Sequence, residues 1–223
     1  MRLVFASNNA HKLAEVKEIM PAGVEVLSLR DIGFEAEIEE TGTTLEENSY
    51  IKASTVADFI NGRMLNGDAT LNDESIDGVF ADDTGLEIDA LGGEPGVYTA
   101  RWYLQDEGAE EAKTDMENYA RNRAKALREL AGKSDRGCQF RTVITLIRIQ
   151  ESGVRSEDAT LQVSGIVRGR ITEEEYGQGG FGYDPVFVPE GYDKTFGELP
   201  AELKNHISHR ARALAELVKL LKR

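Results

Sequence analysis

Two hydrophobic periodicities alternate along this chain, and this alternation limits the fold more than any other feature. Residues 3–6 form a short apolar run, which predicts a buried strand. From Lys12 the spacing becomes helical, and Pro21 with Gly23 marks the end of that helix. The apolar positions of the helix are Leu13, Val16, Ile19 and Met20. The chain is therefore predicted to open as strand, polar loop and helix.

The same two patterns continue to residue 222. Helical spacing predicts helices over 45–60, 109–130 and 209–222, and β-branched or apolar runs predict strands over 79–81, 86–91, 140–149, 159–168 and 186–188. The two longest strands look connected as a hairpin, which indicates a mixed sheet. We predict one α/β domain over 1–223, with the polar Gly/Asn/Asp-rich stretch 61–78 as a surface insertion.

Charge and cysteine content exclude several classes of protein. The formal net charge of −14 disfavours binding to a nucleic acid, although a local basic cluster can still hold a small phosphate ligand. No stretch approaches the roughly 20 apolar residues of a membrane span, so we expect a cytoplasmic protein. Cys138 is the single cysteine, which excludes an intrachain disulfide, and its place in an apolar run predicts a packed residue rather than a nucleophile.

Two short nucleotide motifs are present but stand in the wrong context. Residues 177–182 match G-x-G-x-x-G, whose dinucleotide-binding form needs a strand before it and a helix after it. Here 173–176 looks helical, and Pro185 opposes a following helix. Residues 132–134 resemble the end of a Walker A loop, but Leu127 replaces its first glycine, so a helix stop is the better interpretation.

A polar loop between the first strand and the first helix is a candidate phosphate site. It consists of Ser7, Asn8, Asn9, Ala10, His11 and Lys12. Free backbone N–H groups at a helix start, together with a lysine, can hold phosphate. Ser and Asn are also favoured helix caps, and taken alone the motif is better explained by helix capping than by phosphate binding.

Paired carboxylates form a candidate metal site. Asp82-Asp83 directly follows an apolar run, at the predicted end of a buried strand, and Glu39-Glu40 lies earlier in the chain. Adjacent carboxylates repel each other unless a cation binds or one is protonated, and Mg²⁺ commonly takes one or two carboxylates plus substrate phosphates. The alternative is a solvated acidic turn, which applies more strongly to Glu39-Glu40.

The C-terminal third supplies basic and aromatic candidates. Lys204, His206, His209 and Arg210 surround the start of the last helix, where they could donate to a carbonyl oxygen or a phosphate. Residues 181–185 are FGYDP, and an aromatic ring on a glycine-rich loop can stack on a base. An exposed polar helix entry and a turn whose rings fill the core are the structural alternatives.

Five segments, in this order, resemble the inosine triphosphate pyrophosphatase family, which acts on non-canonical purine nucleotides. The segments are FASNNAHKLAEVKEIM (5–20), EETGTTLEENSYIKA (39–53), ADDTGLEIDALGGEPGVYTARW (81–102), GGFGYDPVFVPEGYDKTFGEL (179–199) and LKNHISHRARAL (203–214). The resemblance implies an elongated mixed sheet flanked by helices, two lobes around a central cleft, and a homodimer. It also implies hydrolysis of ITP, dITP and XTP to the monophosphate and pyrophosphate.

The resemblance assigns roles by position. The Ser7–Lys12 loop, Asn48 and Lys52 resemble groups that face the triphosphate. Glu40 and Asp83 resemble Mg²⁺ ligands, with Asp83 also the base that activates water, and Thr84 resembles a substrate contact. The base- and substrate-binding groups are represented by Phe181, Gly182, Tyr183, Asp184, Lys204, His209 and Arg210.

Three other functions compete with this one. A Maf-like pyrophosphatase would prefer pyrimidine or modified nucleotides, and the FGYDP and SHR segments favour the purine enzyme over it. A nucleotide-binding module without turnover would not need both the acidic and the basic sets. A metal-stabilised structural protein would leave the phosphate loop unexplained.

Overall fold

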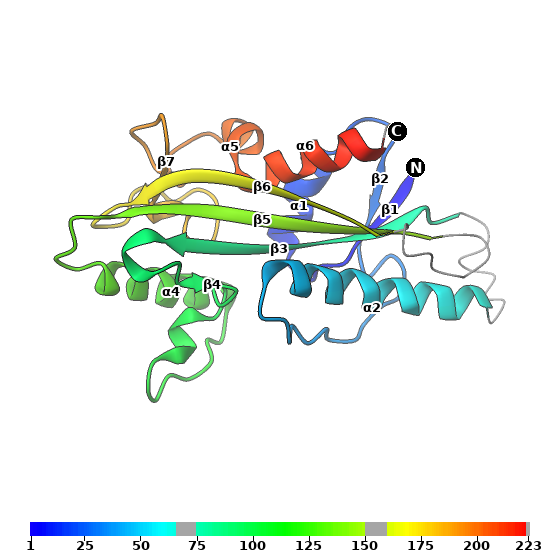
Figure 1. Cartoon of the computed structure of the whole chain (residues 1–223), viewed down its shortest axis with the longest axis horizontal. Helices are drawn as coiled ribbons and strands as arrows, with labels where there is room; N and C mark the ends of the chain where they lie inside the picture. The colour runs from blue at the N-terminus through cyan, green and yellow to red at the C-terminus, as the bar shows by residue number, and fades with distance from the viewer. Residues whose placement is uncertain (66–74, 150–159, 222–223) are drawn as a thin grey trace. The chain divides into compact units, whose positions relative to one another are not determined.

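The computed structural model describes residues 1–65, 75–149 and 160–221. Its helices and strands alternate along the chain, as the sequence predicts (Figure 1). They are β1 (Arg2–Phe5), α1 (Ala10–Ile19), β2 (Glu25–Leu27), α2 (Leu45–Leu65), β3 (Gly78–Ile88), η1 (Asp89–Leu91), β4 (Pro95–Gly96), η2 (Trp102–Gln105), α4 (Asp115–Glu129), β5 (Gly137–Arg148), β6 (Thr160–Ile171), η4 (Asp184–Val186), β7 (Phe187–Pro189), α5 (Ala201–Ile207) and α6 (His209–Leu221).

The strands form a mixed sheet, so the predicted α/β class is confirmed. Their hydrogen-bonding order is β2-β1-β3-β5-β6-β7, with β4 paired to β3. β1 is parallel to both β2 and β3, whereas β4 is antiparallel to β3 and β7 to β6. The described residues divide into two compact units, and β3, β5 and β6 contribute residues to both. Unit 1 contains 1–83, 143–164 and 213–223; unit 2 contains 84–142 and 165–212.

Unit 1 has a hydrophobic core on each face of its strands. One face packs against α2, and the other packs against α1 and the C-terminal part of α6 (Figure 1). Along β3 the side chains alternate between the two cores: Val79 and Ala81 belong to the α2 core, and Phe80 belongs to the α1/α6 core. This alternation, which is inherent to a strand, determines where the following acidic residues point.

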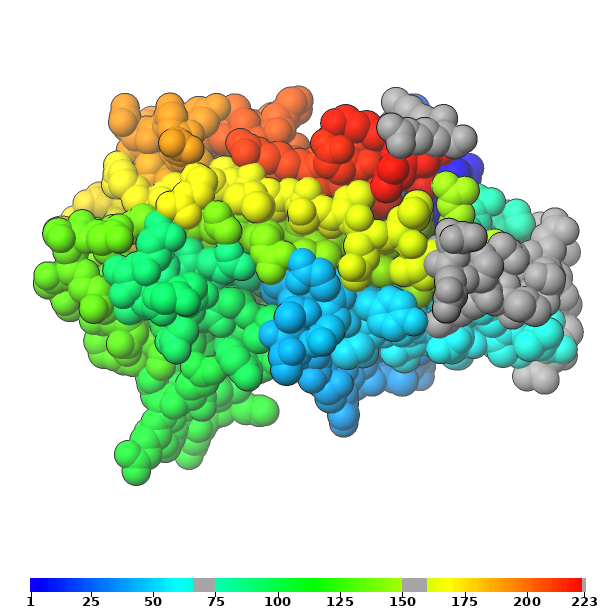
Figure 2. All heavy atoms as spheres, in the orientation of Figure 1, coloured from blue at the N-terminus to red at the C-terminus, as the bar shows by residue number. Residues whose placement is uncertain are grey.

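Unit 2 has one core of its own, which gathers around Trp102, Phe140 and Phe187. Helix α4 contributes Ala126 to this core, and so does Leu130, which is the C-cap residue of the helix. The chain between η2 and α4 extends outward from this unit, and residues 107–111 are all exposed (Figure 2). None of the described helices is long and apolar enough to cross a membrane.

Several predicted boundaries were wrong. The helix predicted over 45–60 continues to Leu65, because its buried face extends beyond Ile60 to Asn61. The helix predicted from 109 begins only at Asp115, where Thr114 caps it. Residues 173–176, predicted to be helical, contain no helix. Of the predicted insertion over 61–78, residues 66–74 lie outside the described part of the chain.

The most consequential correction concerns β3. The sequence predicts two strands separated by Asp82-Asp83-Thr84-Gly85, but one strand runs unbroken from Gly78 to Ile88. Both aspartates therefore lie inside a buried strand, at 2% and 6% exposure. Burial of an isolated carboxylate is costly, so this strand requires positive partners on both faces.

Candidate active site

The predicted phosphate loop lies at the junction of β1 and α1 in unit 1. Asn9 is the N-cap of α1, and its Oδ1 accepts a hydrogen bond from the Lys12 backbone N–H at 3.0 Å. Ser7 Oγ accepts from the Asn9 N–H at 3.2 Å. The capping interpretation is therefore confirmed for Asn9. Asn8, Ala10 and His11 are exposed, so a ligand can reach the positive end of this helix.

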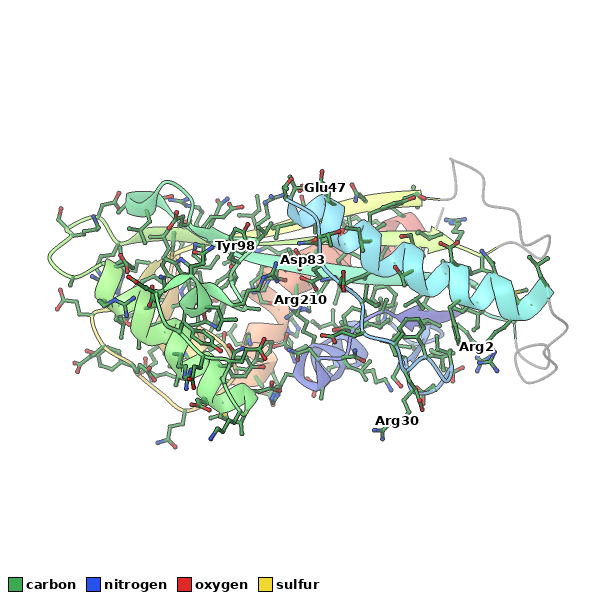
Figure 3. All side chains as sticks on the ribbon, turned by 90° about the horizontal axis from the view of Figure 1, so that it is seen from below. Arg2, Arg30, Glu47, Asp83, Tyr98 and Arg210 are labelled. Atoms are coloured by element: carbon green, nitrogen blue, oxygen red, sulfur yellow. The ribbon has the colours of Figure 1, made fainter. Side chains whose placement is uncertain are left out.

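The two aspartates of β3 pair with lysines from different helices. Asp82 Oδ1 accepts from Lys12 Nζ of α1 at 2.9 Å. Asp83, on the opposite face of the strand, accepts at its Oδ1 from Lys52 Nζ of α2 at 3.0 Å. Adjacent carboxylates are thus tolerated because strand alternation separates them and gives each a counter-charge. Figure 3 labels Asp83, which stands at the midpoint of β3.

Lys52 joins Asp83 to the second predicted metal ligand. Its Nζ also donates to Glu40 Oε1 at 2.6 Å, and Glu40 is half-buried in the loop before α2. Burial raises the pKa of Asp83 above its usual range and outweighs the opposing attraction of Lys52 and Lys12. Burial lowers the pKa of Lys52, but Asp83, Glu40 and Asp82 together raise it above its usual value. Lys52 is therefore a buried cation held by carboxylates.

One oxygen of this cluster is unused. Asp83 Oδ2 is buried and has no hydrogen-bond partner among the described residues. Such an atom indicates a missing ligand, water or ion, because buried carboxylate oxygens are normally satisfied. Within the described residues, no group of three or more His, Cys, Asp and Glu side chains forms a ready-made metal cage. Glu40 and Asp83 therefore resemble an oxygen site that a substrate would complete.

The loop before α2 is held against the start of that helix. Thr44 Oγ1 accepts from the Glu47 N–H at 3.1 Å, while Glu47 Oε2 accepts from the Thr43 N–H at 2.6 Å and the Thr44 N–H at 3.2 Å. This is a capping box with an additional donor. These hydrogen bonds lower the pKa of the Glu47 carboxyl, and the bond from the Thr43 backbone N–H has the largest effect.

The predicted substrate residue Asn48 is fully buried in this region. Its Oδ1 accepts from the Gly42 N–H at 2.8 Å, and its Nδ2 has no partner among the described residues. A Cβ at Gly42 would lie 2.6 Å from Asn48 Oδ1, so only glycine allows this approach. The E-T-G-T motif therefore positions both Glu40 and a donor that is ready for a ligand.

Unit 2 gathers the predicted aromatic and basic groups. Lys204 Nζ from α5 lies 4.5 Å from the centroid of the Phe181 ring, and the guanidinium of Arg210 from α6 lies 5.9 Å from it. The ring of Tyr119 from α4 is 6.1 Å away. Phe181 is half-buried, whereas Lys204 and Arg210 are buried. A half-buried ring with two cations nearby is suited to a flat, electron-rich ligand such as a base.

Asp184 fixes the loop that carries this ring. Its Oδ2 accepts from the Phe181 backbone N–H at 2.7 Å and from Lys204 Nζ at 2.6 Å. Gly180 has φ +71° and a Cβ there would lie 1.9 Å from Asp184 Oδ2, so this position requires glycine. The glycine-rich loop is followed by η4 and β7 rather than a long helix, which confirms that it is not a dinucleotide motif.

Tyr183 differs from its neighbours. Its ring belongs to the core of unit 2, and its hydroxyl donates to the Thr99 carbonyl at 3.0 Å. Burial raises the pKa of the Tyr183 hydroxyl far above its usual range. Its side chain therefore stabilises the fold, as the core-filling alternative predicts, and Gly182 beside it is half-buried.

His209 and Thr84 are linked by a residue that sequence reasoning missed. Thr142 of β5 is fully buried, and its Oγ1 lies 2.6 Å from His209 Nδ1 and 2.8 Å from Thr84 Oγ1. The His209 ring stacks on Phe140, with centroids 4.9 Å apart. Nothing in the local sequence marks Thr142, since a threonine in a β-branched run is an ordinary strand residue. Only long-range packing of β3, β5 and α6 identifies it.

Comparison with known proteins gives a consistent family. The sequence profile of the Ham1 family matches residues 3–220. A protein of Flavobacterium johnsoniae named dITP/XTP pyrophosphatase is 42% identical over 221 residues, which covers 99% of this chain and 98% of that protein. A protein of the same name from Bacillus subtilis is 43% identical, with coverage of 98% and 96%.

Solved structures agree with the sequence comparisons. The Ham1 protein of Staphylococcus aureus has a TM-score of 0.76 and 35% identity, covering 100% of this chain and 98% of that one. A HAM1 protein from Coxiella burnetii has a TM-score of 0.75 and 32% identity, with the same coverage. The resemblance inferred from the five sequence segments is thereby confirmed. The chain belongs to the Ham1 family.

Proposed function

We propose that this protein is a nucleoside triphosphate pyrophosphatase that hydrolyses ITP, dITP and XTP to the monophosphate and pyrophosphate. Full-length relatives named dITP/XTP pyrophosphatase support the reaction and the substrate class. The observation in this chain that carries the proposal is the buried Asp83, whose Oδ2 has no hydrogen-bond partner in the described part of the chain and whose Oδ1 is joined through Lys52 to Glu40. A purely structural cluster would satisfy that oxygen.

Magnesium is the cofactor we propose for this cluster. Glu40 and Asp83 offer carboxylate oxygens, which Mg²⁺ prefers, and Oδ2 of Asp83, which accepts no hydrogen bond from the residues described, can serve as a ligand oxygen. Mg²⁺ commonly uses only one or two carboxylates and takes its remaining ligands from phosphates and water. When bound, it would neutralise phosphate charge and make the attacking water more acidic. Its chemistry is therefore compatible with the donors present.

The residues of unit 1 account for the triphosphate half of the reaction. Lys12 and Lys52 offset the charge that develops on the departing pyrophosphate. Asp83 orients a water molecule and accepts its proton, and its raised pKa makes it a better base than an ordinary carboxylate. The water oxygen bonds to the α-phosphorus, and the bond from that phosphorus to the bridging oxygen breaks. The bridging oxygen leaves with pyrophosphate.

The residues of unit 2 account for base selection. We propose that Phe181 stacks on the purine while His209 and Arg210 donate to its 6-oxo group. Adenine presents an amino donor at that position, so these donors would face a donor and lose their hydrogen bonds. Buried, unsatisfied donors are costly, and ATP is therefore expected to be a poor substrate. Thr84, the first residue of this segment of unit 2, directly follows Asp83 of unit 1 in the sequence.

A substrate panel tests the proposal. Pyrophosphate release is measured from ITP, XTP, dITP, ATP, GTP and dTTP, each with Mg²⁺ and with EDTA. Fast release from the first three, slow release from the others and loss of activity in EDTA are expected. Release from dTTP alone would instead indicate the Maf-like pyrimidine activity, and folded protein that releases nothing would indicate a binding module.

We also propose a cytoplasmic homodimer. The single cysteine fits a reducing compartment, and burial raises the pKa of the Cys138 thiol to about 12, so this residue is unreactive. Light scattering coupled to size exclusion tests the dimer: a mass near twice the 24.6 kDa of the chain is expected, and the mass of a monomer would contradict it.

A further inference from the structure

A series of hydrogen bonds between side chains ends at His209, and its direction determines which ring nitrogen of His209 carries a proton. Thr84 Oγ1, Thr142 Oγ1 and His209 Nδ1 follow one another at 2.8 and 2.6 Å, all within unit 2. Thr142 is fully buried and His209 is 7% exposed, so water cannot readily replace either side chain as a hydrogen-bond partner of the other. The question is which atom donates at each step.

A threonine hydroxyl has a single hydrogen, so Thr142 can donate to only one of its two neighbours. If it donates to His209, then Nδ1 is an acceptor, the ring is neutral and its proton is on Nε2. If His209 donates to Thr142 instead, a neutral ring leaves Nε2 as an acceptor. Only the first arrangement gives a neutral histidine that can donate to a 6-oxo group.

Two features favour the first arrangement. Arg210 Nη2 donates to Thr84 Oγ1 over a long 3.5 Å, and a guanidinium can only donate, so the chain receives a donor at its Thr84 end. A hydroxyl that accepts from a cation becomes a stronger donor, which favours donation from Thr84 to Thr142 and from Thr142 to His209. In addition, His209 is buried directly before Arg210 in the sequence, where a second positive charge would be repelled.

We propose that Thr142 is a positioning residue that holds His209 as the neutral tautomer with its proton on Nε2, and thereby sets the preference for 6-oxo over 6-amino purines. Thr142 acts through His209 rather than by touching the substrate. The inference rests on the proposed function, because it assigns the cause of base preference at that same site. Its first prediction, the tautomer, can nevertheless be observed without any substrate.

The first test is spectroscopic. Two-bond ¹⁵N–¹H correlation spectra of the nucleotide-free, full-length protein report which ring nitrogen carries the proton. The chain has three histidines, so the His11→Gln/His206→Gln double variant leaves His209 as the single ring signal. A protonated Nε2 and a bare Nδ1 are expected. A proton on Nδ1, or on both nitrogens at pH 7.5, would overturn the proposal.

The second test compares three variants by kcat/KM for ITP and for ATP. Thr142→Val removes the hydroxyl at nearly constant shape, and we expect the ITP:ATP ratio to fall about tenfold, equivalent to about 1.4 kcal/mol. Thr142→Ser restores the hydroxyl, and the ratio should return to within about twofold of the starting protein. The His209 spectrum should change in the valine variant and recover in the serine variant.

Thr172→Val is the matched control. Thr172 is also buried in unit 2, but the oxygens near its Oγ1 are the backbone carbonyls of Glu174 at 2.6 Å and Val186 at 3.2 Å, and its one hydrogen is donated within this pair. Loss of this hydroxyl should lower stability without changing the ITP:ATP ratio or the His209 spectrum. An unchanged ratio in folded Thr142→Val, or an equal fall in Thr172→Val, would overturn the proposal. If Thr142→Val does not fold, the spectra of the double histidine variant with Thr142 and with Thr142→Ser decide. A protein that hydrolyses no nucleotide, yet shows the expected tautomer, would refute the proposed function and not the tautomer.

Discussion

Removing the charge of Lys204 should destabilise the protein strongly, because it takes a cation away from the buried Asp184 carboxylate. The two side chains are 7% and 9% exposed, and Lys204 Nζ donates to Asp184 Oδ2 at 2.6 Å. Truncating one partner of a buried pair costs about 3–5 kcal/mol. The Phe181 N–H still donates to the same oxygen at 2.7 Å, so the loss of unfolding free energy in Lys204→Met should lie at the lower end of this range, about 3 kcal/mol.

A double-mutant cycle separates the pair from its surroundings. Asp184→Asn keeps the shape and an acceptor for the Phe181 N–H but removes the negative charge. In Lys204→Met/Asp184→Asn no buried charge is left uncompensated, so its loss of stability should be smaller than the sum of the single losses by about 1–3 kcal/mol. Lys194→Met, at an exposed lysine of the same unit, should change stability by less than about 0.5 kcal/mol.

Urea unfolding followed by circular dichroism measures these differences, and KM for ITP measures the effect on the Phe181 loop. Lys204→Met should raise KM, since Lys204 lies 4.5 Å from the Phe181 ring and fixes the carboxylate that holds this loop. Two results would refute the reasoning: a loss below about 1 kcal/mol for Lys204→Met, which is the range of an exposed pair, or strict additivity in the cycle.

Three further predictions concern catalysis, the glycine loop and base preference. Asp83→Asn should lower kcat for ITP by about 10²–10⁴-fold, since it removes the proposed base, and the variant should remain folded because Glu40 still pairs with Lys52; retention of most activity would exclude that role. Gly180→Ala should lower the free energy of unfolding by well over the roughly 1–2 kcal/mol that a left-handed residue costs, because the new Cβ would also collide with Asp184 Oδ2. Gly191→Ala is the control, since Gly191 has φ +85° and nothing within 4 Å of a Cβ; in the same urea titration it should show only the backbone cost. Arg210→Ala should reduce the preference for ITP over ATP about tenfold or more in the pyrophosphate assay, and an unchanged preference would show that this guanidinium does not read the base.

The local hydrophobic pattern of the sequence is sufficient to predict much of the fold. Alternating strand and helix periodicities predict the α/β class, and β1, α1, β5, β6 and α6 lie close to their predicted ranges. Boundaries failed where the deciding information is not local. The chain before Asp115 has a helical pattern, but the helix begins only where Thr114 supplies a cap. The polar Asp82–Gly85 segment looks like a turn, yet tertiary packing makes it the centre of β3.

The order of residues alone already specifies the chemical groups of the site: a capped helix start with a lysine, an acidic pair, an aromatic glycine loop and a basic helix entry. How these groups pair depends on the packing of the folded chain. Asp82 and Asp83 are neighbours in sequence but pair with Lys12 and Lys52, 70 and 31 positions away, because a strand turns successive side chains to opposite faces. Thr142 gains its importance from Thr84 and His209, 58 and 67 positions away. Hydrogen bonds and ion pairs act over a few ångströms of space rather than along the chain, so their partners are set by packing of the sheet and helices.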